Sequence, residues 1–359
     1  MAKGPGLPAE PAFEGRNSRD SPSPQGVFAV GGPCKTRIIT TMNYNKPTYV
    51  TADGFQIATY PHGPETGKPI LLIHGWPELA YSWATTIPAL VDAGYRPIAY
   101  DLLGYGKSDA PPGLDHYRIG NVVGHVEAIL DHYGIAKSLI LGHDWGGIIL
   151  WHVVRMLKHR SIAAISISTP HVGRAPIDPM DIFERRYGQD HYFIRFRDDP
   201  DGVAAMFASD PDAFFRMMFR STPPGMKLTP ELTEIPRRFQ DFLDRGAPDT
   251  GDMIISPEQR RVYSDHYVRT GFLPGMNYYR NTTANWELAE GLSTQIDVPS
   301  LMISPADDFF LPPSTTDSMV KTVSDLTRIT IQDCGHWAMW DQPEAVNSAI
   351  ISWLDQRGF

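Results

Sequence analysis

Short apolar runs alternate with stretches of helical periodicity along the first half of the chain. The first two runs flank the turn signal Ala52-Asp53-Gly54, so a hairpin is predicted from Thr48 to Tyr60. Further apolar runs predict strands, and the periodic stretches between them predict helices. The predicted strands are 69–73, 96–100, 138–141 and 162–168, and the predicted helices are 119–133 and 148–159. This alternation is typical of an α/β fold whose mostly parallel sheet is buried on both faces.

The pattern changes after residue 170. From there to about residue 290 strand signals are absent, and the chain is rich in proline, methionine, aromatic residues and helical periodicity. Strand-like runs return at 300–303 and 327–331, followed by a helix near 344–353. We therefore predict an eight-stranded sheet that is interrupted after its sixth strand by a helical cap. The predicted domains are a core of residues 43–170 and 291–359 and a cap of residues 171–290.

The N-terminal segment has a different composition. Its first 33 residues contain six Pro and six Gly with no apolar period, so residues 1–42 are predicted to form a loosely ordered extension. The segment lacks the apolar run of a secretory signal, and no stretch of the chain approaches the ~20 apolar residues of a membrane span. Only two cysteines occur, which excludes a disulfide framework and favours a cytoplasmic location.

Charge and motifs exclude several classes of partner. The net charge of -9, from 32 basic and 41 acidic residues, argues against nucleic acid or an anionic membrane, because both require a positive surface. No metal or cofactor motif is present. Gly106-Lys107-Ser108 ends like a phosphate loop, but Asp101 stands where the first glycine is required. The oligomeric state is left open between monomer and homodimer.

The most informative stretch is Gly142-His143-Asp144-Trp145-Gly146-Gly147, which joins an apolar strand to a helix. Small residues around the central position allow a sharp turn that projects the central side chain above the sheet, as in a nucleophile elbow. The central residue is Asp144. Taken alone, this turn is equally compatible with an aspartate that only caps the helix. The remainder of the chain has to decide between the two.

Three further segments carry matching chemistry. Leu71-Leu72-Ile73-His74-Gly75-Trp76-Pro77 ends a strand as an oxyanion loop does, so the backbone N–H groups of Trp76 and Trp145 are predicted to hold an oxyanion. Asp308 and then His336 follow the last two strands. The chain order of nucleophile, acid and histidine is that of the α/β-hydrolase fold.

An aspartate at the elbow suits a substrate with an electrophilic sp³ carbon. Attack by a serine on such a carbon would leave a stable ether, whereas attack by Asp144 leaves an ester. Water deprotonated by His336, with Asp308 holding the imidazole, can then hydrolyse that ester. Acyl-transfer enzymes such as esterases and peptidases are disfavoured by this one residue.

These motifs resemble those of the α/β-hydrolase epoxide hydrolases. The resemblance runs from about Asn43 to the C-terminus and includes His74 to Pro77, Asp101 to Ser108, the elbow around Asp144, and Cys334-Gly335-His336-Trp337. It implies a cis peptide between Trp76 and Pro77. The His143 side chain should point away from the face that Asp144 presents, so His143 is expected behind the nucleophile rather than as the base. Cys334 follows the wrong strand for an elbow nucleophile and is expected to be structural.

The resemblance also implies two acids in the cap, because in this family two tyrosines protonate the epoxide oxygen. His191-Tyr192-Phe193-Ile194-Arg195-Phe196 and Asn277-Tyr278-Tyr279-Arg280-Asn281 resemble the two cap motifs, which places the acids at Tyr192 and Tyr279. Arg197 departs from the glutamine that commonly follows the first motif. We expect Phe196, His74 and Trp337 to contact the substrate.

The sequence thus predicts a cofactor-independent epoxide hydrolase that acts on a lipophilic epoxide and water. The apolar cap stretch 206–219 would line the substrate pocket, although packing within the cap is the more general role at helical spacing. A haloalkane dehalogenase with the same nucleophile is the alternative, disfavoured because Trp76 replaces its usual asparagine. A non-catalytic hydrolase-fold receptor is the remote alternative.

Overall fold

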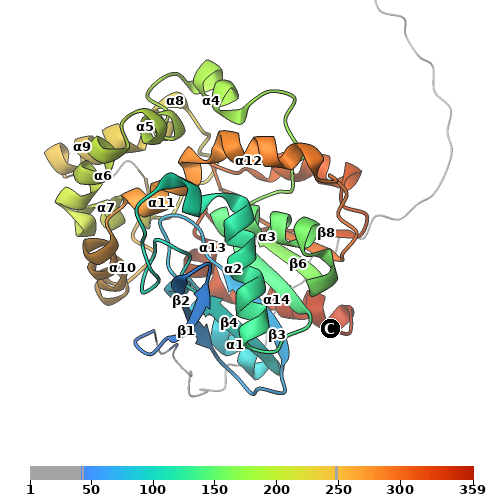
Figure 1. Ribbon diagram of the computed structural model, residues 1–359. Helices are drawn as coiled ribbons and strands as arrows, with labels where there is room; N and C mark the ends of the chain where they lie inside the picture. Colours follow the sequence, from blue (N-terminus) through green and yellow to red (C-terminus); the bar gives the residue numbers. More distant parts are fainter. Residues whose placement is uncertain (1–41, 43, 247–249) are drawn as a thin grey trace, which may run out of the picture. The chain divides into compact units, whose positions relative to one another are not determined.

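A computed structural model describes residues 42, 44–246 and 250–359. An eight-stranded sheet in the order β1-β2-β4-β3-β5-β6-β7-β8 forms its centre (Figure 1). The first two strands form the predicted antiparallel hairpin, β2 pairs antiparallel with β4, and every pairing from β4 to β8 is parallel. The strands are β1 (Thr48–Ala52), β2 (Phe55–Pro61), β3 (Lys68–Ile73), β4 (Tyr95–Tyr100), β5 (Ser138–His143), β6 (Ser161–Ile167), β7 (Ser300–Pro305) and β8 (Leu326–Ile331). The predicted α/β-hydrolase fold is confirmed.

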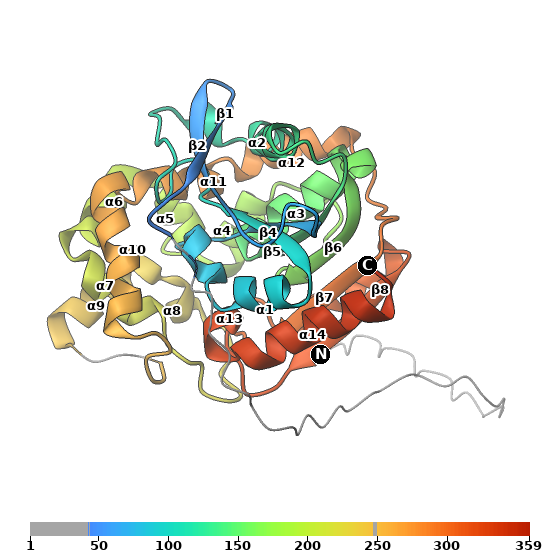
Figure 2. The same ribbon diagram turned by 90° about the horizontal axis from the view of Figure 1, so that it is seen from below.

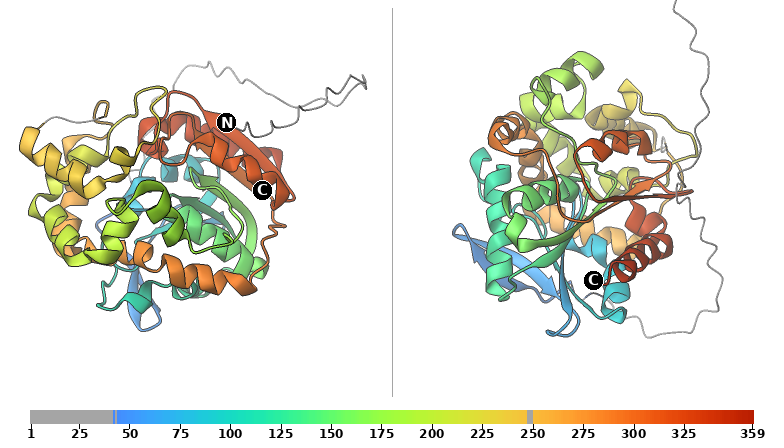
Figure 3. Two further views of the ribbon diagram at one scale, coloured as in Figure 1. Left: turned by 90° about the horizontal axis from the view of Figure 1, so that it is seen from above. Right: turned by 90° about the vertical axis from the view of Figure 1, so that its right-hand side faces the viewer.

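Helices cover both faces of the sheet, so the central strands β5 and β6 are buried along almost their whole length and consist mainly of apolar residues. On one face lie α2 (Ile119–His132) and α3 (Trp145–Met156), and on the other lie α1 (Thr86–Asp92) and α14 (Pro343–Gln356) (Figures 2 and 3). The sequence did not predict α1, and α3 begins three residues before its predicted start because the elbow leads directly into it. Short elements complete the core: η1 (Ala80–Trp83), η2 (Leu114–Tyr117), η3 (Lys158–Arg160), η5 (Pro313–Lys321) and α13 (Ala338–Asp341).

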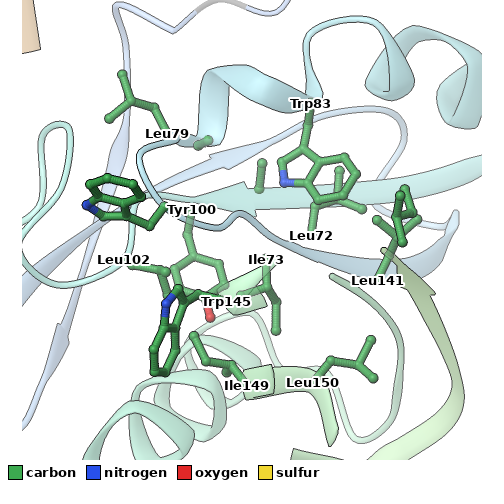
Figure 4. Packing of buried hydrophobic residues seen from close by; sticks show 14 of the residues in the cluster. Leu72, Ile73, Leu79, Trp83, Tyr100, Leu102, Leu141, Trp145, Ile149 and Leu150 are labelled. Atoms are coloured by element: carbon green, nitrogen blue, oxygen red, sulfur yellow. The ribbon is translucent and has the colours of Figure 1, made fainter. Parts of the chain in front are cut away.

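Side chains from neighbouring strand positions enter opposite layers of this core. Figure 4 shows Leu72 pointing toward Trp83 of η1, while the next residue, Ile73, points toward Ile149 of α3. All four side chains are fully buried. This packing on both sides fixes the carboxyl ends of β3 and β5, where two of the predicted site segments begin.

The cap consists of helices and short turns inserted between β6 and β7. Several of its helices start with an aspartate whose side chain accepts a backbone N–H, followed at once by proline, as at Asp178, Asp199 and Asp210. The cap helices are α4 (Pro179–Tyr187), α5 (Tyr192–Asp198), α6 (Pro200–Ser209), α7 (Pro211–Met218), α8 (Pro230–Thr233), α9 (Ile235–Arg245), α10 (Pro257–Thr270), α11 (Leu273–Arg280) and α12 (Thr282–Leu288), followed by η4 (Ala289–Gly291).

The predicted loose extension, residues 1–42, lies outside the described residues except for Met42, whose side chain is buried. Within the described ranges, no helix is both long and apolar enough to cross a membrane.

Candidate active site

Asp144 occupies a sharp turn between β5 and α3. Its backbone has φ 52° and ψ -119°, a strained conformation for a residue with a side chain. The turn requires glycine two residues later, because a Cβ at Gly146 would overlap the carbonyl oxygen of Ile73 in the neighbouring strand. The expected nucleophile-elbow geometry is therefore present. The Asp144 side chain makes no hydrogen bond that caps α3, so the capping interpretation is wrong.

The turn after β3 points a backbone donor at this carboxylate. The Trp76 N–H donates to Asp144 Oδ1 at 2.8 Å. The peptide between Trp76 and Pro77 is cis, as the resemblance implied. Trp145 is the first residue of α3, and the first N–H groups of a helix have no partner within it. The Trp76 N–H thus contacts the carboxylate directly, and the predicted second donor, the Trp145 N–H, belongs to the next residue along the chain.

Asp308 and His336 form a buried pair on the other side of the nucleophile. His336 Nδ1 lies 2.8 Å from Asp308 Oδ2, while Asp308 Oδ1 accepts the backbone N–H groups of Phe310 and Leu311 at 3.0 and 2.9 Å. His336 Nε2 lies 3.6 Å from Asp144 Oδ2. The side chain of Asp144 is 17% exposed and that of Asp308 is fully buried, so solvent reaches the nucleophile rather than the orienting acid.

The charges around His336 shift its protonation strongly. Burial lowers its pKa, but the carboxylates of Asp308 and Asp144 outweigh burial and raise the pKa to about 10. Burial also opposes ionisation of Asp308, yet the His336 imidazolium holds the Asp308 pKa below its usual value. His336 and Asp308 therefore form an ion pair at neutral pH when Asp144 is an unmodified carboxylate.

The two predicted acids, Tyr192 of α5 and Tyr279 of α11, lie side by side in the cap. Their ring centroids are 5.5 Å apart, and the Tyr279 ring also packs edge-on against Trp145 at 4.9 Å and Trp76 at 5.6 Å. Burial raises the pKa of both phenols, and the nearby Asp144 carboxylate raises them further. Both phenols therefore stay protonated at neutral pH, as proton donors must.

The residues predicted to contact substrate have different surroundings. Phe196 is fully buried and packs against Trp76 and both cap tyrosines. The indole of Trp337 adjoins His336, but its Nε1 donates to the Met218 carbonyl and so ties core to cap. In the stretch 206–219, Phe207 and Phe214 also contact Trp76.

His74 does not fit its predicted role. The side chain is fully buried, its Nδ1 lies 2.9 Å from the Gly75 carbonyl, and its Nε2 accepts the Leu102 N–H at 3.0 Å. Both ring nitrogens are thus engaged by backbone, and neither is available to a substrate. The geometry gives His74 the task of bracing the oxyanion turn.

Sequence reasoning missed Glu78, a fully buried carboxylate next to the oxyanion turn. Its Oε2 accepts the Gly75 N–H and lies 2.8 Å from His143 Nδ1. His143 Nε2 in turn lies 2.8 Å from the carbonyl of His336, an oxygen that can only accept, so Nε2 carries a hydrogen. His143 thus stands behind the nucleophile as expected, and Glu78 connects the oxyanion turn to the loop that carries His336.

Within the described part of the chain, no cluster of three or more His, Cys, Asp or Glu side chains could hold a metal. Cys334, two residues before His336, is a buried free thiol whose pKa is raised above its usual value by burial. A thiol in that state is a poor nucleophile, which agrees with the structural role expected for it.

Comparisons with known proteins agree with this geometry. A family model described as the alpha/beta hydrolase fold matches residues 68–343. Epoxide hydrolase A of Mycobacterium tuberculosis is 32% identical over 308 residues, which cover 85% of this chain and 96% of the relative. Bifunctional epoxide hydrolase 2 of Sus scrofa is 31% identical over 294 residues, which cover 81% of this chain and 52% of the relative. The crystal structure of epoxide hydrolase A from Mycobacterium thermoresistibile matches with a TM-score of 0.77 at 30% identity, covering 86% of this chain and 98% of that one. The chain belongs to the epoxide hydrolases of the α/β hydrolase fold.

Proposed function

We propose that this enzyme converts a lipophilic epoxide and water into a vicinal diol through a covalent ester on Asp144. One observation carries the proposal: the two oxygens of the Asp144 carboxylate have different neighbours. Oδ1 accepts the Trp76 N–H, and Oδ2 lies toward His336 Nε2. This arrangement gives Oδ1 the place of the ester carbonyl and leaves Oδ2 as the attacking atom.

In the first step, Oδ2 attacks an epoxide carbon and the carbon–oxygen bond of the ring breaks. The alkoxide that leaves is strongly basic and takes a proton from Tyr192 or Tyr279. The rings of Trp76 and of the two cap tyrosines near Asp144, with Phe196 packed against them, favour an apolar substituent on the epoxide.

In the second step, His336 takes a proton from water, which attacks the ester carbonyl carbon. The backbone N–H groups of Trp76 and Trp145 hold the oxyanion that develops on Oδ1. Collapse releases the diol and restores the Asp144 carboxylate. His336 starts as the imidazolium and passes its proton to the tyrosinate once Asp144 has become an ester. The proton that it then takes from water restores its starting state, so the cycle consumes one epoxide and one water and needs no other reactant.

The same proposal locates the enzyme in the cytoplasm as a monomer or homodimer. Its support is the sequence: two cysteines, an acidic net charge and no apolar stretch of membrane-spanning length.

Two assays test the proposal. Styrene oxide should yield its diol, and a bromoalkane should release no halide, because the tyrosines serve an oxygen leaving group. In the His336→Gln variant the ester should accumulate and add the mass of one substrate to the protein, whereas Asp144→Ala with His336→Gln should gain nothing. Halide release without diol formation, or loss of activity without a trapped ester, would overturn the mechanism.

A further inference from the structure

The cap is joined to the core through two crossings of the polypeptide. The outgoing crossing, residues 168–178, follows β6, and the returning crossing, residues 289–296, leads from α12 toward β7. We call these two crossings the stem. Any movement of the cap as a body against the core has to bend the stem.

Helix α3 holds the outgoing crossing close to the nucleophile. Trp151 Nε1 donates to the Thr169 carbonyl at 3.0 Å, and Thr169 Oγ1 donates to the carbonyl of Asp144 at 2.8 Å. The outgoing crossing is therefore bonded both to the residue that carries the nucleophile and to the helix that starts there.

The same helix holds the returning crossing through Arg155. Its Nε donates to the Ser293 carbonyl at 2.7 Å and its Nη2 to the Leu292 carbonyl at 3.2 Å. The carbonyl of the next residue, Thr294, lies 2.8 Å from Nε2 of the buried His171, which belongs to the outgoing crossing. Three consecutive carbonyls of the returning crossing are thus held, two of them by one guanidinium.

The contacts of Trp151 and Arg155 come from one face of α3, because residues four apart on a helix are neighbours. The outgoing crossing is also bonded to α12, the helix that leads into the returning crossing: Arg174 Nε donates to the Trp286 carbonyl at 3.0 Å, and Trp286 Nε1 donates to the Ala175 carbonyl at 2.8 Å. The stem is therefore one cross-linked unit, and Arg155 fastens its returning half to α3.

We propose that Arg155 is a positioning residue for alkylation of Asp144, although it stands roughly 16 Å from that residue along the helix. The inference rests on the function proposed above. Alkylation requires Tyr192 and Tyr279, which belong to the cap, to meet an epoxide that is attacked by Asp144 of the core. Tyr279 is followed closely by α12 and the returning crossing. Hydrolysis of the ester uses His336, Asp308 and two backbone donors, all of which belong to the core.

Loss of the Arg155 contacts therefore shifts the acids relative to the nucleophile and leaves the hydrolytic groups in place. A displacement of about 1 Å can slow a reaction on the order of 10²-fold when acid and nucleophile must be aligned. This separation of the two half-reactions distinguishes positioning from a general loss of structure.

The test uses Arg155→Met in the His336→Gln background, where styrene oxide leaves an ester that accumulates and can be quantified by protein mass. Ester formation should be at least about tenfold slower than in His336→Gln alone, and Arg155→Lys, which keeps a charged donor, should fall between the two. In the otherwise unchanged enzyme, the decay rate of the ester after a single turnover should stay within about twofold.

Arg160→Met is the matched control. Arg160 also donates to two backbone carbonyls, those of Ala136 and Ile135, but it holds the segment between α2 and β5 and not the stem. Its ester formation should be unchanged. Equal slowing in both variants, or equal slowing of ester formation and decay in Arg155→Met, would overturn the proposal.

A second readout needs no substrate. Hydrogen–deuterium exchange should become faster in residues 289–296 of Arg155→Met and remain unchanged there in Arg160→Met. If the stem loosens but no variant forms an ester from an epoxide, the proposed function fails, although Arg155 does hold the returning crossing. If esters form and the stem does not loosen, the role proposed for Arg155 is wrong.

Discussion

The protonation state of His336 depends on whether Asp144 carries a charge. In the free enzyme the two carboxylates raise the His336 pKa to about 10 against the effect of burial, so the imidazole is protonated at pH 7 and cannot accept a proton from water. Alkylation turns Asp144 into a neutral ester and removes one of the two charges. With only one carboxylate left to counteract burial, the His336 pKa falls. His336 therefore becomes neutral, and able to accept a proton, in the hydrolysis step, where it acts as the base.

This coupling predicts a pH profile. The rate of ester hydrolysis should rise with pH as His336 loses its proton, and should level off at an inflection well below pH 10. Single turnovers with styrene oxide, quenched between pH 5 and 10 and read by protein mass, give this rate. An NMR titration of His336 in the free enzyme supplies the comparison. An ester-decay inflection near 10, equal to that of the free enzyme, would contradict the coupling.

Glu78 shows which residues sequence reasoning finds and which it misses. Asp144, Asp308 and His336 each follow a predicted strand in a known order, so motif and order together indicate them. Glu78 acts through His143, which lies 65 positions farther along the sequence, and no local sequence pattern predicts that contact. The only signal is a carboxylate directly after Pro77 in a turn that is otherwise apolar.

Removing Glu78 should be costly because its partner is equally buried. Glu78→Ala leaves the His143 side chain and the Gly75 N–H without their acceptor, and each buried donor left unsatisfied costs about 1–3 kcal/mol of the unfolding free energy. Asp131→Ala is the control. It breaks a pair with Arg160 in which the carboxylate is exposed, and a loss below about 1 kcal/mol is expected. Denaturant unfolding measures the unfolding free energy of both variants. Similar losses in the two would mean that the buried contacts of Glu78 stabilise the fold no more than the Asp131 pair does.

At the scale of elements, the strands were easier to predict than the helices. Each buried strand is a short apolar run between turn signals, so every one of them was predicted to within about two residues. The start of α3 was missed because the turn residues Trp145 to Gly147 are themselves helical. The cap was predicted only as a helical region, since its many prolines serve as helix starts and obscure a continuous helical period.

The pairing of α5 with α11 leads to a prediction about the acids. Because the Tyr192 and Tyr279 rings are neighbours, each can donate to the same oxygen, and either single change to phenylalanine should slow alkylation only in part. The double change removes both donors. Loss of a positioned acid costs about 10²- to 10⁴-fold, so the double variant should fall well below either single variant.

Ester formation in the His336→Gln background measures this effect directly. Circular dichroism and thermal unfolding of the same variants serve as the control for folding, because removal of a hydroxyl leaves both rings in place. A double variant that still opens styrene oxide at nearly the starting rate would make the tyrosines packing residues.

At the scale of the whole molecule, hydrogen bonds join the cap to the core, and the sequence of either part alone does not predict them. On the cap helix α10, the Tyr263 hydroxyl accepts the Trp340 Nε1–H at 3.0 Å and lies 2.8 Å from Ser82 Oγ, and both partners belong to the core. Arg269 of the same helix donates to the Gly106 carbonyl, and Tyr278 of α11 donates to the Leu103 carbonyl. Such contacts depend on tertiary register, which apolar periodicity does not encode.

These shared bonds predict that cap and core unfold together. Tyr263→Phe leaves two buried core groups without a partner, and should lower the unfolding free energy by about 1–3 kcal/mol while keeping one cooperative transition. Tyr267→Phe, one turn later on α10, is a matched control: within the described residues the Tyr267 hydroxyl is buried without a hydrogen-bond partner, so its removal should cost nothing. Denaturant unfolding followed by tryptophan fluorescence and by circular dichroism reports on both parts. If Tyr263→Phe separated the two signals into distinct transitions, the cap would be an independent folding unit, and the remaining cap–core hydrogen bonds would not couple its unfolding to that of the core.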